Sequence, residues 1–143
     1  MRKLLSLLLV FSLCYVAWNE LGLEQQLFSG PAEADAILRE AYQNSQSDIQ
    51  VEGSGRVITL LADDTDGSPH QRFILRLNSG QTLLIAHNIA LAPRIPKLET
   101  GDTVEFYGEY EWNYKGGVLH WTHDDPQRRH VAGWLKHNGR TYQ

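Results

Sequence analysis

Apolar and polar residues alternate with a period of two over much of the chain after residue 49, and turn-forming residues interrupt the alternation repeatedly. This pattern is typical of short β-strands with one buried side and one solvent-facing side. It predicts five strands, over residues 49–62, 70–78, 81–87, 103–112 and 118–123. In the second strand, Phe73 and Leu75 are expected to face the core, whereas Arg72 and Arg76 face the solvent.

The connections between these strands predict how they are joined. An acidic, turn-rich loop follows the first strand, a Ser-Gly turn follows the second, and residues 88–102 hold two prolines and at most a helical turn near Ala90. This order is that of the five-stranded Greek-key barrel called the OB-fold. A small β-sandwich is the main alternative. The expected barrel core is Phe73, Leu75, Leu83, Ile85, Val104, Phe106 and Trp121.

Gly53 and Gly55 in the first strand would allow the strong bend that a barrel corner needs. The predicted fold class is therefore all-β, a small OB-fold-like Greek-key barrel preceded by an N-terminal signal or anchor and a short helix. We divide the chain into a signal or anchor (residues 1–20), a helical lead-in (21–49) and the barrel domain with a C-terminal tail (50–143).

The two segments that flank the predicted barrel have helical patterns. In the lead-in, Ser29 is a candidate N-cap and Pro31 fits the first turn. Its apolar positions are Ala34, Ile37, Leu38 and Ala41. We expect this stripe to pack on the barrel, with binding of a partner as the alternative. In the tail, Val131, Trp134 and Leu135 also have helix-like spacing, and we expect this segment to cover an open end of the barrel.

The N-terminus has the features of an export signal. Arg2 and Lys3 precede an uncharged apolar run over residues 4–18. This run is short for a membrane span of about 20 residues. Ala17 is the best cleavage candidate, but Tyr15 stands where a small residue is expected, so an uncleaved anchor stays open. We expect a periplasmic or otherwise exported domain, with attachment to the inner membrane as the alternative.

The composition of the exported part excludes several classes of function. Its sequence holds no cysteine, because the single cysteine of the chain, Cys14, lies within the export segment. A disulfide framework and a thiolate nucleophile are thereby excluded. Residues 21–143 carry 11 basic and 16 acidic side chains, a formal charge of −5. Nucleic acid is not an expected partner, since phosphate neutralisation requires the opposite balance. Membrane contact is expected only through residues 1–20, if they are not cleaved.

Four of the six histidines lie within the last 24 residues, and two of them belong to the sequence HWTHDDP at residues 120–126. In an extended strand, His120 and His123 would face opposite sides of the sheet. They can converge only if the strand ends near Thr122, and Pro126 is consistent with such an ending.

With that bend, His120, His123 and Asp124 would form a site for a divalent cation such as zinc, with Asp125 as an alternative carboxylate. A structural network is also compatible with the sequence, in which an imidazole donates to an aspartate and packs on Trp121. Proton transfer is a third interpretation, because histidine titrates near neutrality. The sequence leaves these three interpretations open.

Candidate ligand contacts lie near the ends of the predicted strands, where OB-folds usually hold their ligands. They are His70, Arg72, His87, Asn88, Trp112 and Tyr114. Asn88 could instead cap the helical turn that follows it. The two aromatic residues could stack on a sugar or a peptide, with packing at the rim of the core as the alternative.

Three short segments connect the chain to a known family. They are HNI at residues 87–89, GEYEWN at 108–113 and HWTH at 120–123. In this order they resemble a family of small exported bacterial proteins that is known as a domain of unknown function and marked by the HWTH motif. The resemblance covers about Val51 to Tyr142. It implies no reaction, ligand or catalytic residue.

The sequence therefore favours a non-enzymatic binding module for a small or extended ligand or a protein partner. The alternative is a metal-assisted hydrolase that uses His120, His123 and Asp124 or Asp125. The sequence contains no serine-nucleophile motif, phosphate-binding glycine loop or dinucleotide fingerprint that would support another reaction class.

Overall fold

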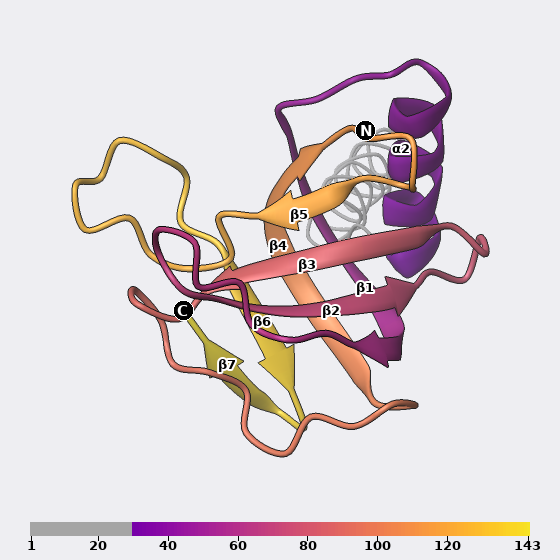
Figure 1. Ribbon diagram of the computed structural model, residues 1–143. Coiled ribbons are helices and arrows are strands. Elements are labelled where there is room, and N and C mark those ends of the chain that lie inside the picture. The colour runs from indigo at the N-terminus through magenta and orange to yellow at the C-terminus, as the bar shows by residue number, and fades with distance from the viewer. Residues whose placement is uncertain (1–29) are drawn as a thin grey trace, which may run out of the picture.

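The computed structural model describes residues 30–143 and shows a closed five-stranded β-barrel with one helix, α2 (Pro31–Gln43), packed against it (Figure 1). The barrel strands are β1 (Ile49–Leu60), β2 (His70–Arg76), β3 (Thr82–Asn88), β4 (Thr103–Glu111) and β5 (Val118–His120). A hairpin of β6 (Trp134–His137) and β7 (Arg140–Tyr142) follows. The predicted export segment, with Cys14, lies outside the described residues. Within residues 30–143, no helix is long and apolar enough to span a membrane.

The strand order confirms the predicted OB-fold-like barrel. Hydrogen-bonded neighbours run β1-β2-β3-β5-β4, and β4 pairs again with β1 to close the barrel. All barrel pairings are antiparallel except β3 with β5, which is parallel. Each barrel strand therefore has a paired neighbour on both sides, and this closure distinguishes the fold from the two-sheet sandwich considered above.

β1 changes its pairing partner along its length, as a strand at a barrel corner does, and glycine allows close packing on its first part. The first part of β1 pairs with β4 and the last part with β2, with a register shift between Val57 and Thr59. A Cβ atom on Gly53 would lie 2.8 Å from the ring of Phe106 and 2.9 Å from the Cβ of Ala34. Any side chain at position 53 would therefore displace either the barrel core or the helix.

The predicted core is confirmed at all positions except Trp121. Phe73, Leu75, Leu83, Ile85, Val104 and Phe106 are all buried in the core, and Tyr110 of β4 joins them there. Trp121 is only partly buried, because β5 ends at His120 and the chain leaves the sheet there. Leu119, two residues before Trp121, is the core residue that β5 supplies.

Helix α2 packs on the barrel as expected. It buries Ala34, Leu38 and Ala41, whereas Ile37 of the predicted stripe is exposed. The N-cap is Gly30 rather than the predicted Ser29, and no side chain caps the helix.

The C-terminal tail forms a β-hairpin, so the helical expectation for this segment was wrong. β6 pairs with the first half of β4, and Leu135 lies opposite Phe106 in this pairing. Its side chain is fully buried, because alternate residues of a strand face one side and Leu135 faces the core. β5 and β6 thus share one edge of β4, and residues 121–133 form a loop that leaves the sheet between them.

Candidate functional site

Three strand ends meet at the end of the barrel that is remote from α2 (Figure 1). β2 begins at His70, which pairs with Asn88 at the end of β3, and β5 ends nearby at His120. A cavity of about 270 Å³ lies here. Its lining residues are His70, Ala86, Asn88, Leu91, His120, Trp121 and His123. Two of the six predicted ligand contacts, His70 and Asn88, therefore lie in one cavity with both histidines of the HWTH sequence.

Trp121 is the central side chain of this region, and its backbone has a positive φ of 53°. Three imidazole rings surround its indole. The ring of His130 stacks on it with 4.1 Å between centroids and 7° between planes. The rings of His123 and His120 lie 5.5 Å and 6.3 Å away in tilted arrangements. Left-handed backbone is rare for a bulky residue, so the surrounding contacts must hold it in place.

Gly133 closes the base of the loop that follows Trp121. Its N–H donates to the carbonyl of His123 at 3.0 Å. A Cβ atom on Gly133 would lie only 1.9 Å from the Trp121 carbonyl oxygen and 2.5 Å from that of Tyr107. The two ends of the loop can approach each other this closely only with glycine at position 133.

Asp125 organises the outer part of the loop. Its carboxylate accepts hydrogen bonds from the backbone N–H groups of Gln127, Arg129 and His130, at 2.9, 2.7 and 2.9 Å. These bonds, led by those from Gln127 and Arg129, lower the pKa of Asp125. A second hollow of about 630 Å³ lies between this loop and Trp121. Leu91 and Trp121 line both the hollow and the first cavity.

His130 has a proton-accepting partner at each ring nitrogen. Nε2 lies 2.6 Å from Oε2 of Glu109, and Nδ1 lies 2.8 Å from the carbonyl oxygen of Val131. With Glu109 as a carboxylate, both partners accept, so these two contacts favour the doubly protonated imidazolium form of His130. Desolvation, the largest single effect, lowers the pKa of His130, but Glu109, the Val131 carbonyl and Asp125 together outweigh it and raise the pKa.

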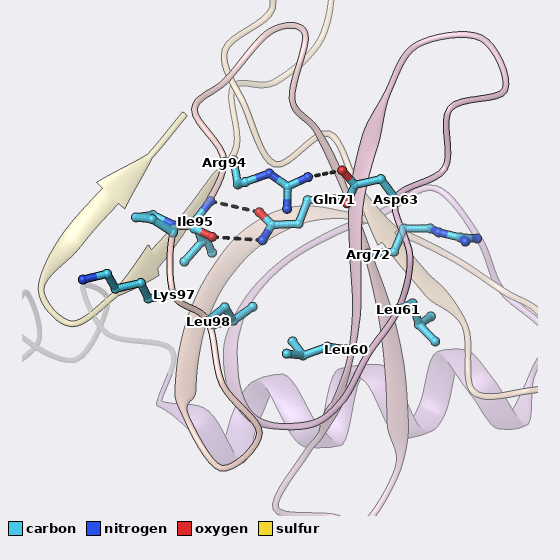
Figure 2. A pocket seen from close by; sticks show the side chains of 10 residues that line it. Leu60, Leu61, Asp63, Gln71, Arg72, Arg94, Ile95, Lys97 and Leu98 are labelled. Carbon is cyan, nitrogen blue, oxygen red and sulfur yellow. Dashed lines mark hydrogen bonds and ion pairs between the residues drawn. The ribbon is translucent and has the colours of Figure 1, made fainter.

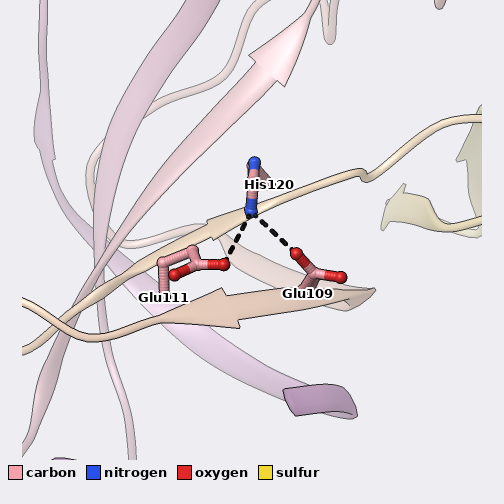
Figure 3. A group of neighbouring side chains, drawn as sticks. All are labelled: Glu109, Glu111 and His120. Atoms are coloured by element: carbon pink, nitrogen blue, oxygen red, sulfur yellow. Dashed lines mark ion pairs between the residues drawn. The ribbon is translucent and has the colours of Figure 1, made fainter. Parts of the chain in front are cut away.

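Glu109 also contacts a second histidine, His120. Together with Glu111, these two residues form a group of three potential metal ligands (Figure 3). Nε2 of His120 lies 3.3 Å from Oε1 of Glu109 and 3.8 Å from Oε1 of Glu111. The three donor atoms lie within 4.8 Å of one another. His120 Nε2 is buried and has no hydrogen-bond partner among the described residues. Burial and the neighbouring Asp48 raise the pKa of Glu111.

The structure does not bring the three predicted metal ligands His120, His123 and Asp124 together. Within residues 30–143, the group with metal-ligand spacing contains His120 but neither His123 nor Asp124. Nδ1 of His123 instead donates to the backbone carbonyl of Asp124 at 2.7 Å. The bend that the prediction required is present, but it directs His123 inward, where it is almost fully buried.

His87, a predicted ligand contact, is fully buried in the barrel wall. Its Nε2 donates to the carbonyl of Pro93 at 3.0 Å, and its Nδ1 accepts from the hydroxyl of Thr122 at 2.8 Å. Desolvation by burial lowers the pKa of His87 to about 4, and the charges of His123 and His70 act in the same direction. This side chain is a neutral structural bridge and does not face a ligand.

The other predicted ligand contacts lie elsewhere. Arg72 donates to the Ala62 carbonyl at 3.1 Å and lines a separate cavity beside the ion pair of Asp63 and Arg94 (Figure 2). Trp112 lies at the α2 end of the barrel, where its Nε1 donates to the Tyr42 carbonyl at 3.0 Å.

Tyr114 also lies at the α2 end, and its side chain is 73% exposed. Asn88 has both roles that the sequence allowed, since its side chain accepts from the N–H of Ala90 at 3.0 Å and lines the cavity. The predicted turn near Ala90 is present.

Sequence reasoning missed Glu109 and Glu111, although a signal existed. The turn at residues 113–117 makes β4 and β5 a hairpin, in which Glu111 pairs with Val118 and Glu109 with His120. Residues that pair directly in an antiparallel hairpin share one face of the sheet. Extending the hairpin register from the turn would thus have placed Glu109 beside His120.

Comparison with known proteins gives a family for the chain. No curated protein matches the sequence. A family model described as "Protein of unknown function (DUF3465)" matches residues 22–143, which include all of the barrel, the β6–β7 hairpin and α2. The chain therefore belongs to the DUF3465 family.

Proposed function

We propose that the chain is an exported binding module that holds a small ligand against Trp121, in the cavity at the ends of β2, β3 and β5 and in the adjoining hollow. The observation that carries this proposal is the strained, partly exposed Trp121, which borders both spaces and is surrounded by three imidazole rings. Strained backbone persists where the surroundings over-determine it, and such positions cluster at binding sites. An aromatic wall with a few convergent polar groups is a common form of ligand site.

The lining of the hollow favours a planar ligand with an anionic group. Trp121 and Pro126 offer apolar surface, and Arg129 and the imidazolium of His130 offer positive charge. Among the described residues, Asp125 supplies the one carboxylate that lines the hollow, and it is occupied by three backbone N–H groups. An aromatic or cyclic carboxylate would combine stacking with an ion pair to Arg129.

The proposal is tested with benzoate and its neutral counterpart benzamide as probes. We expect benzoate to shift the indole N–H resonance of Trp121 in NMR spectra and to leave that of Trp112, at the other end of the barrel, unchanged. Arg129→Gln should weaken benzoate binding about tenfold and leave benzamide binding nearly unchanged, since a lost charge-assisted hydrogen bond is worth about 1.4 kcal/mol or more. Equal shifts at both tryptophans, or none at Trp121, would contradict the proposal.

Export is part of the same proposal and rests on Arg2, Lys3 and the apolar run at residues 4–18. A reporter enzyme that is active only outside the cytoplasm is fused after residue 30. We expect an active fusion, and fractionation then separates a cleaved, soluble product from an anchored one. An inactive fusion that stays in the cytoplasm would remove the export proposal without affecting ligand binding by the purified domain.

A metal-assisted hydrolase is the second candidate, and the group of Glu109, Glu111 and His120 is the observation in its favour. Hydrolysis needs a coordination position that is open to the substrate. His120 lines the cavity, but the nitrogen that faces the carboxylates is buried. This burial favours a structural use of the group over a catalytic one, and we therefore place binding first.

A further inference from the structure

We infer that Glu109, Glu111 and His120 form a binding site for a single Zn²⁺ ion that ties β4 to β5 beside the proposed ligand cavity. The group adjoins the proposed ligand cavity, which His120 also lines, but its donor atoms are those that His120 of β5 and the two glutamates of β4 turn toward one another (Figure 3). It requires no ligand on Trp121, and the proposed binding function requires no metal.

The spacing of the donor atoms supports coordination. Zinc binds imidazole nitrogen and carboxylate oxygen at about 2.0–2.2 Å, so two ligand atoms of a tetrahedral site lie about 3.3–3.5 Å apart. The two distances from His120 Nε2, 3.3 Å to Glu109 and 3.8 Å to Glu111, are close to this value. Only small side-chain adjustments would be needed to place an ion between the three atoms.

The burial of His120 Nε2 adds to this geometric argument. The atom is buried, although 35% of the side chain is exposed, and within the described residues it has ion-pair contacts with Glu109 and Glu111 but no hydrogen bond. A buried polar atom without a hydrogen bond is costly and calls for an explanation, of which an ion is one. A metal ion would satisfy the nitrogen lone pair and both carboxylates together.

The surroundings of the group have the features of an outer coordination sphere. The second oxygen of Glu109 accepts from the His130 imidazolium at 2.6 Å, which fixes the carboxylate and leaves its other oxygen for an ion. Asp48 lies against Glu111 and adds negative charge. Two carboxylates facing one imidazole nitrogen form a donor set that suits a doubly charged cation.

The chemistry of the donors favours zinc over magnesium or calcium. Mg²⁺ and Ca²⁺ prefer shells made of oxygen, whereas one imidazole with two carboxylates suits Zn²⁺ and similar transition metals. Three protein ligands leave a fourth position, which a water molecule would fill. The ion would then join β4 and β5 where β5 is only three residues long.

The test uses the chain with its export segment removed and without a histidine tag, after treatment with chelator. Zinc is added alone and followed by calorimetry and thermal unfolding, and Co²⁺ serves as a spectroscopic replacement. We expect one zinc ion per chain, a melting midpoint that rises with zinc concentration, and visible Co²⁺ absorption of tetrahedral intensity. Absence of a one-to-one zinc complex would overturn the inference.

Two matched variants decide whether these residues hold the ion. Glu111→Gln keeps the shape of the side chain and should lower zinc affinity at least tenfold and abolish the Co²⁺ spectrum. Glu105→Gln changes an exposed glutamate of the same strand, which pairs with Lys136, and should bind zinc like the wild type. Equal zinc affinity in wild type and Glu111→Gln would overturn the inference.

Circular dichroism in chelator shows whether Glu111→Gln folds. If it does not fold, a third variant is used. In that case His120→Asn, which removes the imidazole ligand, must lose the Co²⁺ spectrum, and retention of the spectrum would overturn the inference. Benzoate binding is measured separately in chelator, so failure of the ligand proposal and failure of the metal inference give different results.

Discussion

Trp121 and His130 stack face to face, with their ring centroids 4.1 Å apart and 7° between the ring planes. The same imidazolium donates to Glu109 on β4 and to the backbone carbonyl of Val131. His130 thereby joins the end of β5, the long loop and the sheet at one point. A cation on an indole face adds attraction to this arrangement, and tryptophan is the best aromatic partner for it.

Replacing His130 should loosen the whole loop. We expect His130→Ala to lower the free energy of unfolding by about 2 kcal/mol, because Glu109 loses its hydrogen-bond donor and Trp121 loses a stacking partner. Urea unfolding at pH 7 measures the change. The adjacent Val131→Ala serves as the control, since this side chain is 54% exposed and its removal should cost less than about 0.5 kcal/mol. Equal losses would mean that His130 does not anchor the loop.

Gly133 should tolerate no side chain. In Gly133→Ala the new methyl group would meet the carbonyl oxygens of Trp121 and Tyr107, so we expect the loop base to open and the Trp121 indole resonance to move. Gly139 in the β6–β7 turn provides the control. It has a positive φ of 76° but open space around it, so alanine there should cost about 1–2 kcal/mol of local strain and leave the indole resonance unchanged. An unperturbed Trp121 resonance in Gly133→Ala would contradict the close approach.

The barrel was predictable because its determinants are local. Period-two alternation placed Phe73 and Leu75 in the core and Arg72 outside it, and the order of the connections favoured the OB-fold over a sandwich. The C-terminal hairpin was missed because four residues of β6 are too few to separate period two from helical spacing. The segment becomes a strand because the three-residue β5 leaves the first half of one β4 edge unpaired, and β6 pairs there. This is a tertiary feature with no local sequence signal.

The candidate site was predictable only in part, for a related reason. His70, Asn88, His120 and His123 were identified from their positions at strand ends, and they share a cavity. The partners of His120 depend on strand register, which alternation alone does not give. The burial of His87 depends on the connection after β3 folding back, so that the Pro93 carbonyl covers the ring.

The strand register itself is testable by truncation on the two faces of β2. Phe73 is fully buried, and Phe73→Ala should cost about 3–5 kcal/mol of unfolding free energy through lost burial and a residual cavity. Ile74 points the other way and is only partly buried, so Ile74→Ala should cost markedly less. Denaturant titration compares the two variants. Similar costs would show that the register of β2 is shifted by one residue.

The buried His87 makes the stability of the barrel depend on pH. The ring is neutral in the fold, where burial lowers its pKa to about 4, whereas an unfolded histidine titrates near its usual 6.5. Between these values the unfolded state binds more protons than the folded state. The contribution of the neutral His87 ring to the free energy of unfolding is therefore complete above about pH 6.5, and it is lost as the pH falls toward 4.

The loss should amount to about 3 kcal/mol over this range, from about 1.4 kcal/mol for each unit of pKa difference. It is measured by urea unfolding of wild type and His87→Gln at intervals from pH 8 to pH 4. We expect the variant to be less stable at neutral pH, because the bridge from Pro93 to Thr122 is weakened, and the difference from wild type to shrink as the pH falls. His70→Gln, which removes a partly exposed histidine of the same region, should keep most of the wild-type dependence. If the His87→Gln and wild-type curves run parallel from pH 6.5 to 4, His87 is not the group that couples the fold to pH.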